Sequence, residues 1–136
     1  MAIANLPGLA MEVRSRWFSS AAMPDAGQPR YVNGVVRLRG DVSPSQLLAE
    51  LQNLERLAGR VRGAPNAART LDLDIIDMNG LVRDAPDPVL PHPRAQHRAF
   101  VLLPLRDVAP AWVHPVTGAP IGQLIAQLPP QDLRPA

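Results

Sequence analysis

The stretch Arg69-Thr70-Leu71-Asp72-Leu73-Asp74-Ile75-Ile76 alternates apolar and acidic residues, which is the pattern of a β-strand with one buried face. Because successive side chains of a strand point to opposite faces, Asp72 and Asp74 are expected on one side and the apolar residues on the other. Two neighbouring carboxylates repel each other unless a cation lies between them, and hard oxygen ligands suit Mg²⁺. The pattern therefore predicts a metal-binding strand, although a half-buried strand with a wet acidic face would carry the same residues.

Basic residues flank the acidic pair on both sides. Arg60, Arg62 and Arg69 precede it, and the segments Leu-Pro-His-Pro-Arg at 90–94 and His-Arg-Ala-Phe at 97–100 follow it. Arginine binds phosphate oxygens through a planar fork of N–H donors, and carboxylate-bound Mg²⁺ neutralises phosphate charge. Together these residues indicate phosphoryl transfer. Taken singly, an arginine-rich surface loop or a histidine between prolines is also compatible with a purely structural role.

The composition is that of an ordinary globular domain. Of 136 residues, 46% are hydrophobic and 19% charged, and the formal net charge is +2, with arginine as every one of the 14 basic residues. The absence of cysteine excludes disulfides and thiol chemistry. No apolar run approaches the length of a membrane span. We therefore expect one cytoplasmic domain over residues 1–136, with 129–136 as a loose tail.

Periodicity and turn residues predict an α+β order of elements. Strands are expected at residues 12–20, 31–38 and 70–76, and helices at 43–59, 100–108 and 121–128. The first helix has the clearest boundaries, with Ser43 as N-cap, Gln46 completing a capping box and Gly59 as the stop. Asn79-Gly80 predicts a tight turn, and the prolines of residues 85–93 exclude regular structure there.

Four motifs in this order resemble one known family. The runs RTLDLDI at 69–75, LPHPR at 90–94, RAFVLLPL at 98–105 and HPVTG at 114–118 look like those of the hydroxymethyldihydropterin pyrophosphokinases. The resemblance extends from about Val13 to Leu128. It implies an enzyme of folate biosynthesis that transfers pyrophosphate from ATP to the hydroxymethyl group of 6-hydroxymethyl-7,8-dihydropterin and releases AMP.

The resemblance also implies a ferredoxin-like antiparallel sheet with helices on one face and further helical elements at the C-terminal end. Members of the family begin with a strand and a long helix, whereas residues 2–9 of this chain can supply only the end of that helix. The first strand is therefore expected to be missing, which would leave sheet edges unpaired. The resemblance implies a monomer for the full-length family, and for this form unpaired sheet edges would allow self-association.

Site residues follow from the resemblance position by position. Asp72 and Asp74 match the two aspartates that bind two Mg²⁺ ions on the ATP phosphates. The positions matching residues that contact ATP or its phosphates are Gln52, Glu55, Arg60, Arg62, Arg69, His92 and Arg98. The positions matching the pterin site are Tyr31, Asn33 and Phe100. A solvated helix face would equally explain Gln52 and Glu55, and helix core would explain Phe100. His97 and His114 are expected to be structural, the latter fixing a turn.

The sequence is also compatible, to different degrees, with two other classes of function. A nucleic-acid-binding ferredoxin-like module would need exposed aromatics and basic residues on its central strands, but only 4% of this chain is aromatic and the key strand is acidic. A catalytically inactive homologue that acts as an interaction or regulatory protein is the stronger alternative, because of the missing first strand.

Overall fold

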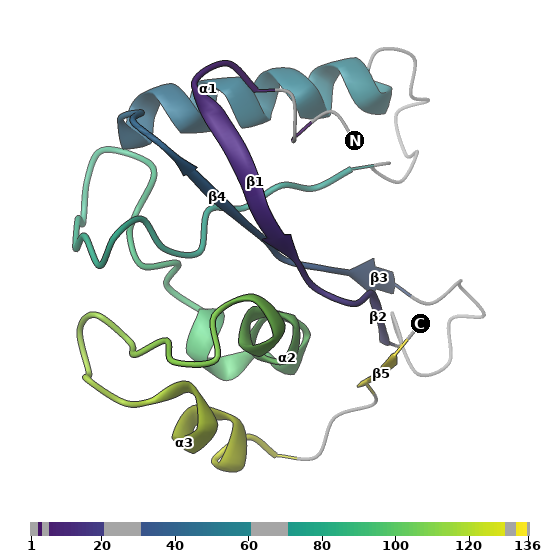
Figure 1. The fold of residues 1–136 in the computed structure, drawn as a ribbon, viewed down its shortest axis with the longest axis vertical. Helices are drawn as coiled ribbons and strands as arrows, with labels where there is room; N and C mark the ends of the chain where they lie inside the picture. Colours follow the sequence, from purple (N-terminus) through teal and green to yellow (C-terminus); the bar gives the residue numbers. More distant parts are fainter. Residues whose placement is uncertain (1–2, 4–5, 21–30, 61–70, 130–132, 136) are drawn as a thin grey trace. The chain divides into compact units, whose positions relative to one another are not determined.

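The computed structural model describes residues 3, 6–20, 31–60, 71–129 and 133–135, without the side chains of Tyr31, Arg60 and Arg134. Along the chain (Figure 1) lie β1 (Leu9–Arg14), β2 (Phe18–Ser20), β3 (Tyr31–Asn33), β4 (Val36–Gly40), α1 (Pro44–Glu55), a π-helical turn (Arg56–Arg60), a 3-10 turn (Ala95–His97), α2 (Ala99–Val108), α3 (Ile121–Ala126) and β5 (Leu133–Pro135). The chain divides into two compact units, Met1–Ala10 with Arg39–His92 and Met11–Leu38 with Pro93–Ala136. None of the described helices is both long and apolar enough to span a membrane.

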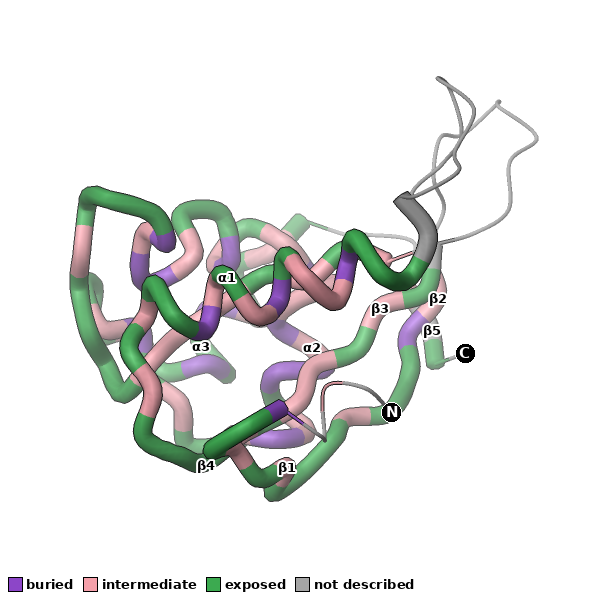
Figure 2. Tube along the Cα trace, turned by 90° about the horizontal axis from the view of Figure 1, so that it is seen from above, coloured by how far each residue is buried: buried purple, intermediate pink, exposed green. Residues whose placement is uncertain are grey.

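The strands form two small sheets. One pairs β1 with β4, and the other has the order β3-β2-β5 with antiparallel neighbours, in which Phe18 lies opposite both Asn33 and Pro135. Most residues of β1 and β4 are exposed or only half-buried (Figure 2). These antiparallel strands together with the helices confirm the predicted α+β class.

Each of the first two predicted strands is interrupted. Residues 12–20 divide between β1 and β2, and residues 31–38 between β3 and β4. At the interruption the backbone N–H of Ser15 donates to the Val35 carbonyl, and the Val35 N–H donates to the Ser15 hydroxyl, both at 2.8 Å. A Cβ on Gly34 would lie 3.1 Å from the ring of Trp17, so a side chain there would crowd the indole. The close approach of these two segments explains why each long strand breaks at this point.

The helix α1 organises the core of the first unit. Its capping box is complete, because the Ser43 hydroxyl accepts from the Gln46 N–H while the Gln46 side chain accepts from the Ser43 N–H. Leu47 and Leu51 face inward and form a buried cluster with Leu6. The partly buried residues packed on this cluster are Ile3, Leu9, Val42, Leu54, Leu73, Ile75 and Met78. Regular α-helix ends at Glu55, and the π-helical turn carries the chain past Gly59 to Arg60.

The helix α2 organises the core of the second unit. Leu102 and Pro104 are fully buried, and Leu105 and Val108 nearly so. Pro104 lies inside the helix. The helix contacts β2, β3 and α3, so it links the three-stranded sheet to the last helix. Phe18, on the central strand β2, is only 3% exposed and belongs to this core.

Two expectations about secondary structure are wrong. The described part of the predicted strand at 70–76 is assigned no regular structure, because a strand requires a neighbouring ladder and the described sheets do not include these residues. The tail at 129–136 was expected to be loose, yet Leu133–Pro135 forms β5 and pairs with β2. Whether each segment is a strand therefore depends on a neighbouring strand. Residues 133–135 have one in β2, whereas residues 71–76 are in none of the described sheets.

Candidate active site

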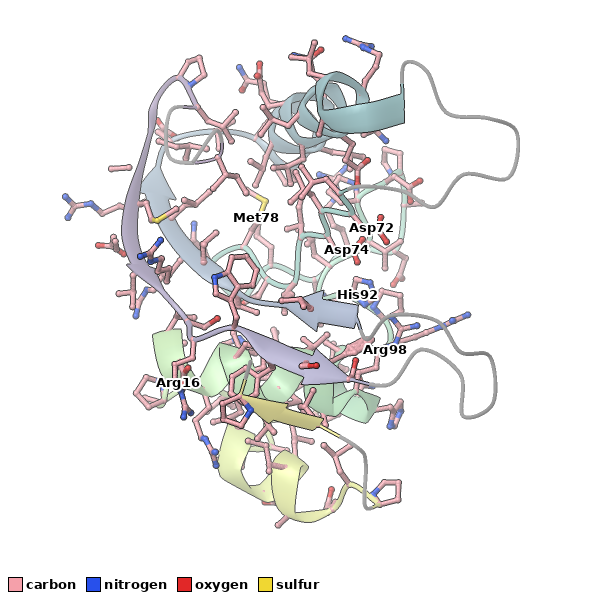
Figure 3. The ribbon with its side chains drawn as sticks, turned by 90° about the vertical axis from the view of Figure 1, so that its right-hand side faces the viewer. Arg16, Asp72, Asp74, Met78, His92 and Arg98 are labelled. Atoms are coloured by element: carbon pink, nitrogen blue, oxygen red, sulfur yellow. The ribbon has the colours of Figure 1, made fainter. Side chains whose placement is uncertain are left out.

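The acidic segment keeps the predicted alternation although it is not a strand. Leu71, Leu73 and Ile75 are half-buried, whereas Asp72 and Asp74 are exposed. Two of the apolar side chains, those of Leu73 and Ile75, pack on the α1 cluster. Figure 3 shows Asp72 and Asp74 close together, with His92 beside Asp74. Packing of one face on α1 therefore presents both carboxylates on the other face.

Two hydrogen bonds hold the backbone of this segment. The Leu73 N–H donates to Oε2 of Glu55 at 2.7 Å, and the Ile76 carbonyl accepts from the His92 N–H at 2.8 Å. The first bond ties the segment to the end of α1, and the second ties it to the proline-rich segment. The two contacts hold the backbone one residue before and two residues after Asp74.

His92 is positioned by the turn and the proline-rich segment that precede it. Asn79 and Gly80 have φ values of 55° and 74°, which confirms the predicted tight turn, and the Leu81 N–H donates to the Met78 carbonyl at 2.9 Å. The returning chain pairs at Arg83 and Leu90, which exchange backbone hydrogen bonds of 2.8 and 3.0 Å. The turn and this pairing deliver His92 next to the acidic segment.

The imidazole of His92 faces the second carboxylate. Its Nε2 lies 3.9 Å from Oδ2 of Asp74, and the contact is an ion pair only when the imidazole is protonated. The Asp74 side chain is 60% exposed and the His92 side chain 20% exposed. The carboxylate is therefore open to solvent while the histidine is largely held by its surroundings. The imidazole could donate to a phosphate oxygen of a ligand, whereas the carboxylate could face a phosphate only through a cation.

The acidic pair suits a magnesium ion whose coordination is completed by a ligand. No group of three or more His, Cys, Asp or Glu side chains among the described residues has the geometry of a metal cage. Two exposed carboxylates supply hard oxygen donors, and Mg²⁺ is typically held by one or two carboxylates together with water and substrate phosphates. Asp72 and Asp74 fit that role.

The predicted pterin residues lie in the second unit. Tyr31 and Asn33 are the ends of β3, and the half-buried Asn33 lies opposite Phe18 in the sheet. Phe100 is in the first turn of α2 and is half-buried, so it is not the core residue that the alternative reading expected. The guanidinium carbon of Arg98 lies 5.3 Å from the Phe100 ring centroid, within the range of a cation–π contact.

The predicted site residues are divided between the two units. Asp72, Asp74, His92 and Glu55 lie within the first unit, whereas Asn33, Arg98 and Phe100 lie within the second. Gln52 is exposed on α1, as a solvated face would be. Arg60 ends the π-helical turn, and Arg62 and Arg69 fall outside the described residues.

Two histidines were predicted to be structural. His97 is exposed at the end of the 3-10 turn. His114 is only 4% exposed, and its Nδ1 accepts from the N–H groups of Val116 and Thr117 at 3.2 Å each. The Gly118 N–H donates to the His114 carbonyl at 2.8 Å, which closes the turn. The prediction that His114 fixes a turn is confirmed.

The environment of Glu55 differs from what was expected. The residue is 7% exposed, so a solvated helix face is the wrong description, and its carboxylate is bonded to the acidic segment. A signal was present in the sequence, because Glu55 follows Leu47 and Leu51 at intervals of four and therefore continues their inward stripe. The ion pair between Arg16 and Asp107 had no such signal, because 91 positions separate the two residues.

These features describe an α+β protein with a pair of exposed carboxylates, and comparison with known sequences identifies its family. The model of the family described as 7,8-dihydro-6-hydroxymethylpterin-pyrophosphokinase matches residues 1–110. This chain belongs to that family.

Three curated relatives illustrate the match. The 2-amino-4-hydroxy-6-hydroxymethyldihydropteridine pyrophosphokinase of Synechocystis is 41% identical over 126 residues, which are 93% of this chain and 64% of the relative. The enzyme of the same name from Pseudomonas aeruginosa is 40% identical, over 94% of this chain and 78% of the relative. The folic acid synthesis protein of Pneumocystis carinii is 34% identical over 96% of this chain but only 18% of its own length. The chain thus spans less than two thirds of two of these relatives.

Proposed function

We propose that this chain transfers a pyrophosphoryl group from ATP to the hydroxymethyl group of 6-hydroxymethyl-7,8-dihydropterin, in the cytoplasm and as a step of folate biosynthesis. The observation that carries the proposal is the pair of exposed carboxylates, Asp72 and Asp74, held on one side of a segment whose apolar face packs on α1. The names of the relatives and the family model support the same activity.

Asp72 and Asp74 would hold Mg²⁺, up to two ions, against the triphosphate. A bound Mg²⁺ supplies charge neutralisation and polarises the phosphate oxygens. His92, whose Nε2 lies 3.9 Å from the Asp74 carboxylate, would donate a hydrogen bond to an oxygen of the same phosphate group. Because the protein makes no covalent bond itself, its contribution is to position charge where the phosphates gather.

Arginines would bind the remaining phosphate oxygens. Arg98 precedes α2, and Arg60, Arg62 and Arg69 belong to or follow the end of the π-helical turn in the sequence. Their planar guanidinium groups can each grip two oxygens. Gln52, exposed on α1, would contribute a polar contact to the nucleotide.

The second unit would hold the pterin. Asn33 and the Tyr31 backbone on β3 offer directional hydrogen bonds, and the half-buried ring of Phe100 offers a stacking surface. The pterin hydroxyl oxygen would then attack the β-phosphorus in line. The bond from that phosphorus to the oxygen bridging the α-phosphate breaks, AMP leaves with that oxygen, and the hydroxyl proton passes to water. Orienting two reactants in this way can supply about 7–11 kcal/mol of the barrier reduction.

The test is the release of AMP in the presence of ATP, Mg²⁺ and the reduced pterin, followed by chromatography together with ³¹P NMR of the pterin product. We expect equal amounts of AMP and pterin pyrophosphate, and no AMP when the pterin is omitted. A folded chain that releases no AMP under these conditions would overturn the proposal. It would favour the alternative that the chain is a catalytically inactive homologue.

A further inference from the structure

Glu55 is a buried carboxylate whose partner lies between the two aspartates. It is the last residue of α1 and is 7% exposed. Its Oε2 accepts the backbone N–H of Leu73 at 2.7 Å. Leu73 separates Asp72 from Asp74, so this hydrogen bond is made at the centre of the acidic pair.

An apolar residue would be the simpler choice at this position. Glu55 continues the stripe of Leu47 and Leu51 toward the cluster on which Leu73 packs. Burying a carboxylate is unfavourable unless strong hydrogen bonds compensate, and a 2.7 Å bond is at the short end of the range for charge-assisted bonds. The hydrogen bond to the Leu73 N–H is the compensating interaction that the structure shows for this buried carboxylate.

The bond replaces a sheet contact that the segment lacks. A strand N–H would normally donate to a carbonyl of a neighbouring strand, but residues 71–77 are not part of the described sheets. The carboxylate of a helix residue takes that place and ties the segment to α1. Because the apolar Leu73 side chain is also packed on α1, both the backbone and the side chain of this residue are held.

We propose that Glu55 is a positioning residue for the acidic pair: by holding the Leu73 amide it keeps the Asp72 and Asp74 carboxylates in the orientation that binds the metal–nucleotide complex. Its effect on turnover rests on the proposed function, but its effect on metal binding does not. Hydrogen-bond partners that orient metal ligands typically account for about 10–100-fold in metal affinity. The contact that the structure shows for the Glu55 carboxylate is with the backbone: the side chain is 7% exposed and accepts the Leu73 N–H.

Two conservative variants separate geometry from charge. Glu55→Gln keeps an acceptor oxygen at the same reach and removes the charge, whereas Glu55→Asp keeps the charge and withdraws the acceptor from Leu73. If Glu55 acts by positioning, Glu55→Gln should keep its affinity for the Mg²⁺–nucleotide complex to within about fivefold. The reason is that a neutral hydrogen bond is roughly half as strong as a charged one. Glu55→Leu removes the acceptor altogether, and its affinity for the complex should fall about 10–100-fold. Glu55→Asp should show a similar loss.

The measurement is a calorimetric titration of each variant of the full chain with Mg²⁺ and the non-hydrolysable analogue α,β-methylene-ATP. Hydrogen exchange of the Leu73 amide, compared with amides within α1, gives a second readout that needs no activity. We expect Glu55→Leu and Glu55→Asp to bind the complex weakly and to exchange the Leu73 amide faster, and Glu55→Gln to stay near wild type in both. The KM for Mg²⁺-ATP should rise in parallel.

Leu47→Ala is the matched control. It also removes a buried side chain from α1 and the same cluster, but it leaves the Glu55–Leu73 bond in place. We expect lower thermal stability with affinity for the Mg²⁺ complex close to wild type. An equal loss of affinity in this variant would mean that core stability, not positioning, is responsible.

Three results would overturn the proposal. The first is a Leu47→Ala variant that loses as much affinity for the Mg²⁺ complex as Glu55→Leu. The second is a Glu55→Gln variant that binds the complex as weakly as Glu55→Leu does, and the third is a Glu55→Leu variant with unchanged affinity. A weakly binding Glu55→Gln variant would mean that the negative charge of Glu55 is itself required. Failure of the proposed function has a different signature, because a wild-type chain that releases no AMP still answers the titration and the exchange experiment.

Discussion

Two aspartates, one in each unit, show opposite uses of the same side chain. Asp107, at the end of α2, is 20% exposed and accepts three hydrogen bonds from Arg16, from its backbone N–H at 2.9 Å, from Nε at 3.0 Å and from Nη2 at 3.1 Å. Asp74 is 60% exposed and faces an imidazole nitrogen 3.9 Å away. The first carboxylate is saturated by protein donors, and the second is presented to solvent.

The difference has an electrostatic consequence. Hydrogen bonds from Arg16 lower the pKa of Asp107, and partial burial opposes that shift. The guanidinium also lies over the Phe18 ring, 5.1 Å from its centroid, so it joins the chain before β2 to α2. A carboxylate bound in this way stabilises the fold but has little capacity left for a ligand. The Asp74 carboxylate is instead 60% exposed and faces a single imidazole nitrogen at 3.9 Å, so more of its surface is open to a ligand.

The largest expected effect comes from the exposed pair. Asp72→Ala or Asp74→Ala should lower AMP release at least about 100–1000-fold, because each removes a carboxylate that would hold the Mg²⁺ neutralising the phosphate charge. The free energy of unfolding should change by no more than about 0.5 kcal/mol, as for other exposed positions. Activity assays and urea unfolding on the same preparations measure both. A folded variant with near-normal AMP release would contradict the assignment.

Asn33 extends the comparison between structural and ligand-directed side chains to a neutral polar residue. Asn33→Ala should weaken pterin binding by about 1–3 kcal/mol, because polar groups of the ligand would be buried without partners. Binding of Mg²⁺ with α,β-methylene-ATP should be little changed. Isothermal titration with each ligand gives the comparison, with Val32→Ala, exposed on the same strand, as the control. Equal loss for both ligands would place Asn33 with Asp107 among structural residues.

Asp107 should affect stability and not chemistry. Asp107→Ala removes the acceptor of three hydrogen bonds, and after allowance for solvent screening we expect a loss of roughly 1 kcal/mol in the free energy of unfolding. The KM values for ATP and pterin should stay within about twofold, well below the effect of a lost ligand contact. A large fall in turnover with unchanged stability would erase the distinction drawn between the two carboxylates.

The smallest effect is the dependence of this contribution on pH. The pKa of Asp107 is lower in the folded chain, so the unfolded chain binds its proton first as the pH falls. The stabilisation is therefore complete above the unfolded-state value of roughly 3.9 and is lost as the pH falls through the folded-state pKa. Urea unfolding of wild type and Asp107→Ala at pH 7 and at lower pH should show the difference between them shrinking. A difference that grows on acidification would have the wrong sign.

Features that depend on a few neighbouring residues were predicted from the sequence. The capping box of Ser43 and Gln46, the turn at Asn79-Gly80 and the helix from Phe100 to Val108 are present, the last beginning one residue early. Caps and tight turns are set by hydrogen bonds and φ values within four residues, so the sequence alone determines them. The inward and outward sides of the acidic segment also follow from alternation alone.

Tertiary structure decided everything that needs a distant partner. The acidic segment has its two faces without being a described strand, residues 133–135 pair with β2, and Arg16 finds Asp107 at a separation of 91 positions. The same holds for Glu55, whose helical spacing indicates burial but not that its carboxylate meets the Leu73 amide. The physical reason is that ladders, ion pairs and buried hydrogen bonds depend on groups that only the folded chain brings within 3 Å or so of each other. Sequence determined which residues could bind phosphate and metal, and the fold decided which of them are held, and by what.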